Sequence, residues 1–253
     1  MKTKIDPILK RKRRIVVKKI NKISKNMKRL TFSHEDLYDF PESEVGGYVK
    51  LIFADKNDLS KNFARPFTVR NFRRDSLEID IDFVIHDGDH GYASSWLNSV
   101  NNGDEIFITG PGPRERVSHQ ADWFFFVGDM SAIPAISVNL EMLPRNACGI
   151  VILEILSNQD RIKLRKPENI NINWVIDQES NLLESVSNFK WLRGTPFVWV
   201  ACEFSKMKSL RNFFQIKKKI EKTNMYISSY WKSGLNQEEH KILKKNDSEK
   251  WIL

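Results

Sequence analysis

The chain contains little cysteine and no long apolar segment. Its 253 residues include only two cysteines, Cys148 and Cys202. Two thiols are too few for a metal cluster or a disulfide framework, and each lies in or beside an apolar run, so we expect two buried free cysteines. No run of 18 apolar residues occurs, so we expect no membrane-spanning helix. The basic N-terminus lacks the apolar segment of a signal peptide, which favours a cytoplasmic location.

Acidic residues are scarce at the N-terminus. Residues 1–30 contain 13 Lys/Arg and the single acid Asp6, a local net charge of +12. The whole chain carries +9, so the other 223 residues carry −3. A second basic segment, residues 205–232, has eight Lys/Arg against Glu221. Basic clusters attract nucleic acids, anionic membranes or acidic partners, and charge alone does not choose among them.

The first half of the chain has the pattern of β-structure. In residues 76–86, apolar side chains alternate with acids, which is typical of a half-buried strand. Short strands at close spacing, separated by turns such as Gly46-Gly47, favour a small antiparallel barrel. A helical segment, residues 93–100, interrupts the series. The expected strands span residues 14–23, 27–33, 48–54, 67–72, 76–86 and 104–110.

The second half alternates strands with helices, which indicates a parallel α/β sheet. Its first strand, the apolar run WFFFVG at 123–128, is typical of a strand covered on both faces. Further strands are expected at 149–156, 172–177, 196–202 and 225–231, and helices at 132–143, 181–189 and 206–219. We therefore expect an antiparallel β-barrel domain over residues 1–117 and an α/β domain over residues 118–253. The polar tail, residues 235–250, could form a terminal helix or fray.

Proline interrupts a strand-like alternation in NFARPFTVR, residues 62–70. Proline is tolerated in a strand only at an edge, a first residue or a bulge. One interpretation is a strand that enters a sheet after a loop. The other is a backbone shaped to touch a ligand. A flavin needs an apolar surface for its ring, hydrogen bonds to its polar edge and positive charge for its pyrophosphate, and Phe67, Thr68 and Arg65 supply one each.

Residues 82–96, DFVIHDGDHGYASSW, end a strand near His86 and lead through two glycines to a helix start. Small residues and hydroxyls there let backbone N–H groups close on a phosphate. Alternatively, Ser94 only caps the helix, and His86 is an ordinary residue at a strand end.

Two segments of the second half are further candidates. Residues 128–136, GDMSAIPAI, follow an apolar strand and open a helix, which is where ligands bind in a parallel sheet. They lack the dinucleotide glycine fingerprint, and Pro134 is also ordinary at a helix start. In SSYWKSG, residues 228–234, the aromatic pair and Lys232 could cover a flavin or pack at a domain interface. A barrel followed by a nucleotide-type domain suits a flavoenzyme.

Taken together and in this order, these strings resemble one family. The chain is similar to the siderophore-interacting proteins, or ferric-siderophore reductases, of the ferredoxin–NADP reductase superfamily over residues 14–234. The matching strings are YVKLIF, RPFTVR, IDFVIHDGDHGYASSWLNSVNNGDEIFITGPG, FVGDMSAIPAISVNLEMLP, VWVACE and SYWKSG. The chain departs from the family where Phe67 replaces the usual tyrosine, where Gly-Asp-Met-Ser-Ala replaces Gly-Asp-Glu-Thr-Ala, and in a longer loop before Ala93.

The resemblance implies FAD on the barrel, a ferric siderophore as substrate, and NAD(P)H or a reduced ferredoxin as electron donor. We name no catalytic acid or base, because outer-sphere electron transfer requires none, and we expect no metal ligands. The expected FAD contacts are Arg65, Pro66, Phe67, Thr68, Asp82, Phe83, Val84, His86, Ala93, Ser94, Ser95 and Trp231. The expected NAD(P)H contacts are Gly128, Asp129, Ser131, Ala132 and Glu203. The expected basic pocket for the anionic chelate consists of Lys50, Arg114 and Lys232.

Two alternatives stay open. A general flavin reductase or ferredoxin–NADP reductase with another acceptor would share this layout, and siderophore-dependent turnover would separate it from the main interpretation. The basic N-terminus could instead bind nucleic acid through phosphate contacts. Against this, its cations alternate with apolar strand positions, and no nucleic-acid motif is found. We therefore expect no nucleic-acid partner.

Overall fold

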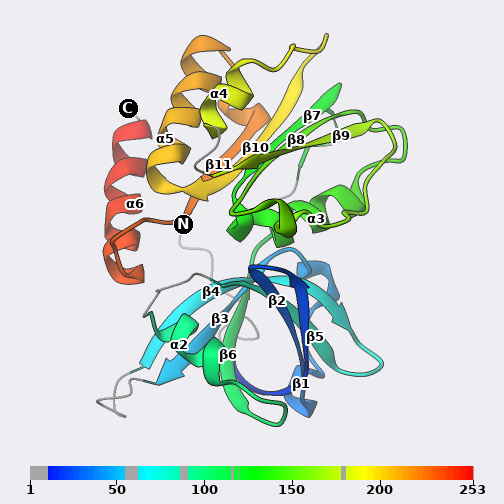
Figure 1. The fold of residues 1–253 in the computed structure, drawn as a ribbon, viewed down its shortest axis with the longest axis vertical. Helices are drawn as coiled ribbons and strands as arrows, with labels where there is room; N and C mark the ends of the chain where they lie inside the picture. Colours follow the sequence, from blue (N-terminus) through cyan, green and yellow to red (C-terminus); the bar gives the residue numbers. More distant parts are fainter. Residues whose placement is uncertain are drawn as a thin grey trace, which may run out of the picture. The chain divides into compact units, whose positions relative to one another are not determined.

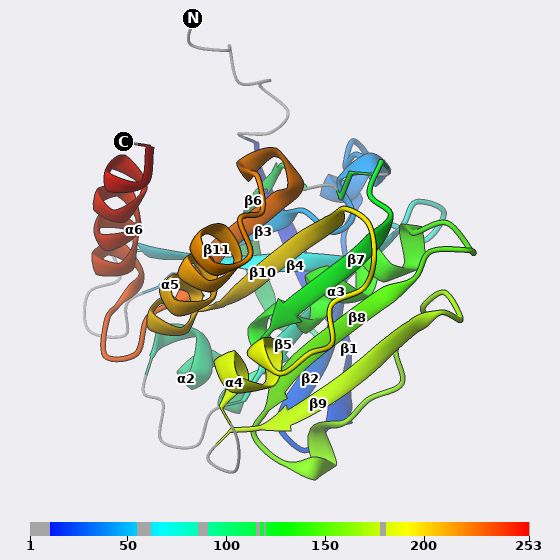
Figure 2. The same ribbon diagram turned by 90° about the horizontal axis from the view of Figure 1, so that it is seen from above.

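The computed structural model describes residues 11–54, 62–85, 91–114, 117–118, 120–177 and 181–252. The chain divides into two compact units, residues 1–115 and 116–253. The first unit is a closed β-barrel, and the second is a sheet with helices on both faces (Figures 1 and 2). Among the described residues, no helix is long and apolar enough to cross a membrane.

The barrel closes through six antiparallel strands in the order β1-β2-β5-β4-β3-β6. The strands are β1 (Lys12–Ser24), β2 (Met27–Ser33), β3 (Tyr48–Ala54), β4 (Asn62–Arg73), β5 (Glu78–Val84) and β6 (Glu105–Gly112). Apolar side chains at alternate positions point inward and form the core, to which Leu30, Leu51 and Ile81 belong. The helix α2 (Tyr92–Ser99) packs Trp96 and Leu97 against this core.

The strand β5 is buried on both faces, so the prediction of a half-buried strand was wrong. Its outward acids Asp80 and Asp82 are only 5% and 7% exposed. Arg73 donates to both oxygens of Asp80 at 2.7 and 2.9 Å, and Arg29 donates to both oxygens of Asp82 at 2.6 and 2.8 Å. Bidentate ion pairs from neighbouring strands, rather than water, therefore satisfy these carboxylates.

Pro66 lies within β4 without breaking the barrel. It is in register with Lys50 of β3, whereas the pairing of β4 with β5 begins only at Val69. Among the described residues, β4 thus has no second partner strand at Pro66. The missing N–H group costs no ladder hydrogen bond at such an edge position. A register shift between Val69 and Asn71 accompanies the point where β4 joins β5.

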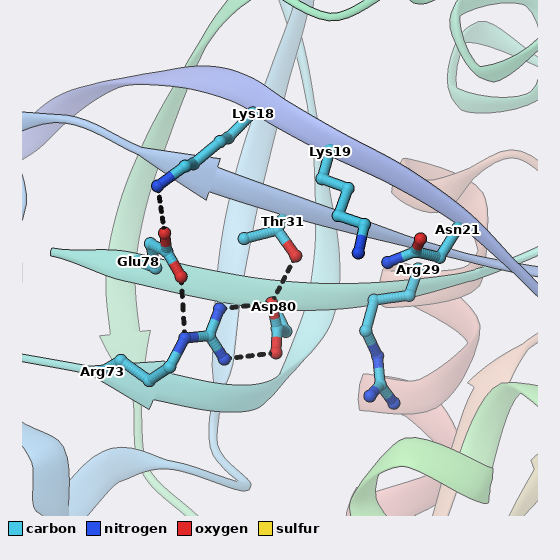
Figure 3. A pocket seen from close by; sticks show the side chains of 8 residues that line it. All are labelled: Lys18, Lys19, Asn21, Arg29, Thr31, Arg73, Glu78 and Asp80. Atoms are coloured by element: carbon cyan, nitrogen blue, oxygen red, sulfur yellow. Dashed lines mark hydrogen bonds and ion pairs between the residues drawn. The ribbon is translucent and has the colours of Figure 1, made fainter. Parts of the chain in front are cut away.

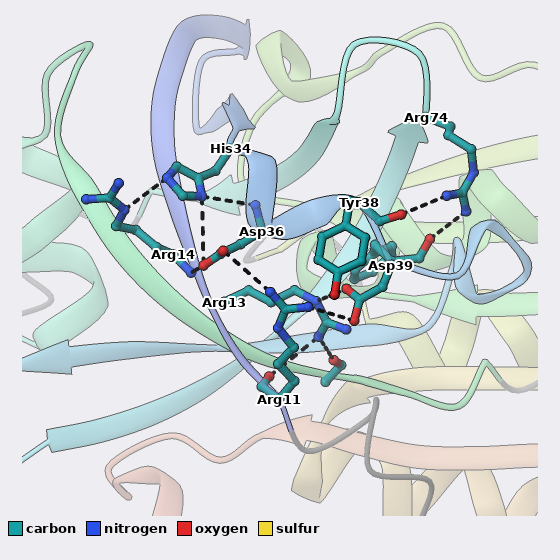
Figure 4. Close-up of polar contacts among 10 residues, drawn as sticks. Arg11, Arg13, Arg14, His34, Asp36, Tyr38, Asp39 and Arg74 are labelled. Carbon is teal, nitrogen blue, oxygen red and sulfur yellow. Dashed lines mark hydrogen bonds and ion pairs between the residues drawn. The ribbon is translucent and has the colours of Figure 1, made fainter.

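The basic residues at the start of β1 form ion pairs with acids of the segment that follows β2 (Figure 4). Arg13 is 0% exposed, and it donates from Nε to Asp39 at 3.0 Å and from Nη1 to the Gly110 carbonyl at 2.7 Å. Arg11 donates to the other oxygen of Asp39 at 3.0 Å and lies 4.8 Å from the centre of the Tyr38 ring. Although partial burial opposes it, these two cations lower the pKa of Asp39. Part of the N-terminal positive charge is therefore neutralised within the barrel unit.

The second unit contains a parallel sheet in the order β11-β10-β7-β8-β9. Its strands are β7 (Trp123–Gly128), β8 (Gly149–Ile155), β9 (Ile170–Ile176), β10 (Pro196–Glu203) and β11 (Met225–Trp231). Counted from β7 in chain order, the arrangement is 3-2-1-4-5, the order of nucleotide-binding sheets. The strand order reverses between β7 and β10, and ligands bind at the carboxyl ends of the strands at such a switch point.

Helices cover both faces of this sheet (Figure 1). The helix α3 (Ile133–Met142) packs on one face beside β7, while α4 (Leu182–Ser187) and α5 (Phe204–Asn212) pack on the other. All six residues of β7 are buried, which confirms the predicted two-sided coverage. A π-helical turn, Phe213–Lys217, continues α5. The 3₁₀ turns are η1 (Glu35–Leu37), η2 (Glu42–Glu44), η3 (Met130–Ala132), η4 (Asn158–Asp160) and η6 (Lys222–Asn224).

The strands and helices expected from the sequence are present. Their ends differ most in α5, which ends at Asn212 rather than at 219 and is continued by the π-helical turn, and in β4, which begins at Asn62 rather than at 67. Cys202 is buried as expected. Cys148 is only partly buried, so its prediction was wrong. It lies in the loop before β8, where its thiol donates to the Asp122 carbonyl at 3.6 Å.

The polar tail forms the helix α6 (Gln237–Ile252), which polar contacts attach to β11. His240 is 4% exposed, and its Nε2 lies 2.9 Å from Ser229 Oγ. Lys244 donates to Ser228 Oγ at 2.6 Å. On the α5 side, Arg211 donates from Nη2 to Asp247 at 2.8 Å. The predicted alternative of a frayed tail is therefore wrong, because these side chains dock the helix.

His240 should make the protein less stable in mild acid. Burial, together with nearby Lys244, lowers the pKa of His240 in the folded protein. The unfolded chain therefore binds more protons below about pH 6.5, so the free energy of unfolding should fall as the pH drops through this range and level off above it. Thermal unfolding at pH 5.5 and 7.5 measures this difference. His240→Gln is the control, and an equal pH dependence in that variant would refute the assignment.

Candidate functional site

The cation Lys50 lies on β3, the strand that pairs with the Arg65–Thr68 segment of β4. Lys50 of β3 is exposed, because its neighbours Val49 and Leu51 point into the core. Its Cα partners are Pro66 on β4 and Thr109 on β6. The barrel therefore brings the expected chelate ligand Lys50 next to the segment expected to bind FAD.

The residues that flank Pro66 keep polar and apolar groups accessible. Arg65 is half-buried, and its Nη1 makes a long hydrogen bond of 3.4 Å to the Ala64 carbonyl. Thr68 is also half-buried, and its hydroxyl makes no side-chain hydrogen bond within the part of the chain that the structure describes. Phe67 packs against Phe83, with 4.6 Å between the ring centres, yet it remains partly exposed. This stretch thus offers a cation, a hydroxyl and an aromatic surface.

The other expected FAD contacts on β5 are less available. Phe83 is 2% exposed within the core, so only its backbone could meet a ligand. The Asp82 carboxylate is held by Arg29. Val84 is half-buried at the end of β5, where it pairs with Met27. His86 lies outside the described residues.

Ala93, Ser94 and Ser95 lie in the first turns of α2 and are half-buried. The helix begins at Tyr92 and its N-cap is Gly91, so the alternative that Ser94 caps the helix is wrong. An α-helix leaves its first N–H groups without intrahelical partners, and such groups bind phosphates. The Tyr92 ring stacks on Phe63 of β4, with 4.0 Å between the ring centres, and so ties the helix start to the Arg65–Thr68 strand.

This set of groups fits FAD. Phe67 presents apolar surface for a ring, Thr68 a hydroxyl, Arg65 a cation, and the start of α2 offers N–H groups for a pyrophosphate. Arg114, the second expected chelate ligand, is instead half-buried, and its Nη1 donates to the Val45 carbonyl at 3.0 Å.

A basic pocket of about 410 Å³ lies on the outer wall of the barrel and is lined by none of the residues expected to bind FAD or the chelate (Figure 3). A register shift between Val17 and Lys19 leaves Lys18 and Lys19 both exposed on this wall. Its acids are already paired: Glu78 accepts from Lys18 and Arg73. No aromatic side chain is among its described lining residues, so it offers no surface to a flavin ring. The lining residues are Lys18, Lys19, Asn21, Arg29, Thr31, Arg73, Glu78 and Asp80.

In the second unit, the expected NAD(P)H contacts gather at the switch point between β7 and β10. Gly128 is buried, and a Cβ there would lie 2.7 Å from the Cβ of Ala132, so glycine allows the helix to approach the strand. Asp129 follows directly and is 7% exposed. It accepts hydrogen bonds from the backbone N–H groups of Ser131 and Glu203, each at 2.9 Å. Burial raises the pKa of Asp129 in spite of these bonds.

Trp231 and Lys232, at the end of β11, contact the same acids. The Trp231 indole donates to Asp129 at 2.8 Å, and Trp231 as a whole remains partly exposed. Lys232 donates to Glu203 Oε1 at 3.0 Å and to Ser205 Oγ at 2.9 Å. Lys232, the third expected chelate ligand, is therefore ion-paired rather than an isolated surface charge. Although burial opposes it, Lys232 and the first N–H groups of α5 lower the pKa of Glu203.

The sequence analysis did not identify three residues at the carboxyl ends of the sheet strands, Glu154, Asp177 and Lys206. Glu154 of β8 is 5% exposed and accepts from Lys206 Nζ at 2.6 Å. The same ammonium donates to Asp177, after β9, at 3.0 Å. A carboxylate thus follows or ends each of the four strands β7, β8, β9 and β10. The available signal was the single acid in the apolar run GIVILEIL.

Family models match both units. Residues 121–234 match the model described as siderophore-interacting protein. Two overlapping stretches, residues 16–63 and 58–115, match the model described as siderophore-interacting FAD-binding domain.

The ferric vibriobactin reductase ViuB of Vibrio cholerae is 30% identical over 238 residues, which cover 85% of this chain and 88% of that protein. The ferric acinetobactin reductase of Acinetobacter baumannii is 27% identical over 197 residues, or 76% of this chain and 68% of that protein.

Solved structures share the fold. The siderophore-interacting protein SipS of Aeromonas hydrophila superimposes with a TM-score of 0.86 at 28% identity, covering 95% of this chain and 99% of that one. The ferredoxin–NADP⁺ reductase of Plasmodium falciparum, at 15% identity and a TM-score of 0.62, covers 86% of this chain and 95% of that one. With matches in both units and a relative aligned over most of its length, the chain belongs to the siderophore-interacting protein family and has a ferredoxin reductase-like fold.

Proposed function

We propose that the protein is an FAD-dependent reductase of ferric iron in siderophore complexes. Its electrons come from NAD(P)H or a reduced ferredoxin, and it releases Fe(II) in the cytoplasm. Two relatives named as ferric-siderophore reductases support this reaction class. The observation that carries the proposal is the register of Lys50 with Pro66, which puts an exposed cation beside the segment that fits FAD.

The chemistry requires electron transfer and release of the metal. Fe(III) is a hard cation held by oxygen donors, and reduction to Fe(II) weakens those bonds so that the metal can leave. FAD, when bound, supplies the conversion of a two-electron donor into single-electron transfers. The chain's own residues bind and orient: Arg65 and Thr68 hold the cofactor, and Phe67 packs beside its ring.

Positive charge of Lys50 on the barrel would hold the anionic chelate. Lys50 is exposed, and among the described residues it makes no contact that a ligand would first have to break. Arg114 would need to release the Val45 carbonyl, and Lys232 would need to share its charge with Glu203. We therefore assign the main contribution to Lys50 and a secondary one to Arg114, and we do not assign Lys232 to the chelate.

The visible absorption spectrum of the purified protein, with identification of the released cofactor, tests the first half of the proposal. Flavin bands and FAD are the expected result. The flavin is then photoreduced under anaerobic conditions with an added amine as the electron donor, and a ferric catecholate is added together with a colorimetric Fe(II) chelator. Reoxidation of the flavin with stoichiometric Fe(II) supports the reductase. A protein that neither contains nor takes up FAD, or a photoreduced protein that leaves the chelate untouched, contradicts it.

Lys50→Ala should weaken binding of an anionic ferric chelate by about fivefold or less, because one exposed charge pair contributes roughly 1 kcal/mol at most. The effect should appear in KM and leave kcat nearly unchanged, since Lys50 stabilises the bound chelate and not the electron transfer. Lys50→Arg keeps the charge and serves as the matched control, and an uncharged ferric hydroxamate should not distinguish the variants. An equal loss with the uncharged chelate would show that Lys50 acts through the fold.

A further inference from the structure

The second basic segment of the sequence, residues 205–232, is only partly used by the contacts described so far. Lys206, Arg211 and Lys232 pair with acids. The other five cations are Lys208, Lys217, Lys218, Lys219 and Lys222. The three consecutive lysines among them follow α5, which starts at the carboxyl end of β10, and precede the amino end of β11. They therefore lie at the amino edge of the parallel sheet, opposite the edge that carries the expected ligand groups.

The loop before β10 adds two cations to this edge. Because β10 and β11 pair in parallel, they begin at the same edge of the sheet, and the segments that lead into them are neighbours. Trp191 joins the two segments, since its ring centre lies 6.3 Å from that of Phe214 and 4.5 Å from Lys218 Nζ. Lys190 and Arg193 flank this anchor and are exposed beside the three lysines.

Two aliphatic side chains are exposed among these cations. Ile216 is 67% exposed and Leu192 is 39% exposed. Ile216 belongs to the π-helical turn that continues α5. Phe213 and Phe214 are buried and anchor this turn, and the Lys218 N–H donates to the Phe213 carbonyl at 3.0 Å and closes it. An anchored turn thus presents an isoleucine to solvent. We call this surface the amino-edge patch, and it consists of Lys190, Leu192, Arg193, Ile216 and Lys217–Lys219.

The two edges of the sheet differ in charge. Residues 188–195 and 213–224 contain six Lys/Arg against the single acid Glu221, and Asp122 lies beside them, where it accepts from the Thr195 N–H at 2.6 Å. Six cations against these two acids give a net charge of +4. At the carboxyl edge, four carboxylates face two ammonium groups. A negatively charged surface would therefore attract the amino edge and leave the carboxyl edge turned away from it.

We propose that the amino-edge patch binds the anionic surface of a lipid bilayer, with its cations on lipid phosphates and with Ile216 and Leu192 in the headgroup region. Anionic leaflets attract clustered lysines and arginines, and apolar side chains beside such cations enter the interface. A nucleic acid would satisfy the cations, but its phosphate backbone offers no site for exposed aliphatic side chains. The proposal does not depend on the reductase function, because no residue of the patch belongs to the groups assigned to FAD, the chelate or the nucleotide.

Sedimentation of the whole chain with lipid vesicles tests this proposal. Phosphatidylcholine vesicles that contain phosphatidylglycerol should bind the protein about tenfold more tightly, or better, than vesicles of phosphatidylcholine alone. The binding should weaken strongly in about 1 M salt, where the Debye length falls to about 3 Å. Equal binding to the two kinds of vesicle, or binding to neither, would overturn the proposal.

Charge reversal locates the binding surface. Lys217→Glu combined with Lys219→Glu should reduce binding to the anionic vesicles about tenfold or more, because two attractive charges become repulsive. Lys22→Glu combined with Lys25→Glu changes the net charge equally at exposed positions of the barrel unit and is the matched control. The control should bind nearly as well as the wild type. An equal or larger loss in the control would mean that net charge or the N-terminal basic segment, and not the patch, holds the membrane.

Ile216→Ser separates insertion from charge. It should reduce binding about threefold to tenfold, because it removes apolar surface that the interface would bury. Ile242→Ser on α6, where the isoleucine is 63% exposed, is the matched control and should leave binding unchanged. Equal effects of the two serine variants would contradict insertion. Tighter binding of duplex DNA than of the anionic vesicles at the same salt, unaffected by Ile216→Ser, would assign the patch to nucleic acid and overturn the proposal.

Discussion

Replacing Arg13 with methionine should lower the free energy of unfolding by about 3 to 5 kcal/mol. The guanidinium is fully buried and bridges Asp39 to the carbonyl of Gly110, so its loss leaves a carboxylate and a carbonyl without their buried donor. Arg11 still reaches Asp39, which keeps the expected loss from being larger. Chemical denaturation followed by circular dichroism measures the change.

The neighbouring Arg14 offers a matched control. Its side chain is 44% exposed and meets Glu105 at 3.3 Å, so Arg14→Met should cost less than about 1 kcal/mol. Adding Asp39→Asn to Arg13→Met should cost less than it does in the wild type, because the two groups interact directly. Equal losses for Arg13→Met and Arg14→Met would mean that the buried bridge contributes no more than a surface ion pair.

Asp129→Ala should destabilise the second unit by about 2 to 4 kcal/mol. The carboxylate joins the ends of three strands: it accepts from Ser131 after β7, from Glu203 on β10 and from the Trp231 indole on β11. Each buried donor left without an acceptor costs roughly 1 to 3 kcal/mol. Part of this loss is offset, because burial disfavours the ionised form of Asp129 and raises its pKa. Chemical denaturation followed by circular dichroism measures the change.

Ser131→Ala separates the carboxylate's role from that of its smallest partner. It removes only the hydroxyl that donates to Asp129, and the backbone bond of Ser131 remains, so a loss below about 1 kcal/mol is expected. Asp129→Asn should resemble Asp129→Ala. The NH₂ group of the asparagine would face N–H or O–H groups that now donate to a carboxylate oxygen. If Asp129→Asn were as stable as the wild type, a single oxygen at this position would suffice as acceptor for the donors of Ser131, Glu203 and Trp231.

Much of the fold follows from periodicity. The apolar residues of β2 and β7 are buried, and the ends of β2, β3, β7 and β11 agree with the sequence because turn residues or charges bound them. The ends of β4 could not be predicted from the periodicity, because Asn62 and the residues around Pro66 pair with β3 alone. Pairing partners decide where such a strand begins, and a local pattern does not contain them.

Burial of charge was the least predictable feature. The acids of β5 have the pattern of a solvent-facing edge, yet arginines from β2 and β4 cover them. At the sheet edge, the motif Gly-Asp-Met-Ser follows β7 and precedes α3 as the sequence predicts, whereas Glu154 and Lys206 come together from segments about 50 residues apart. Ion pairs between distant segments depend on the completed sheet, so single motifs do not reveal them.

The strand order of the second unit also governs when it can form during synthesis. The apolar strand β7 lies at the centre, and its neighbour β10 pairs Pro196 with Trp123. About 70 residues must therefore be translated after β7 before that neighbour exists. During this interval one hydrogen-bonding edge of β7 has no partner strand, a state in which nascent chains are prone to aggregation and are bound by chaperones.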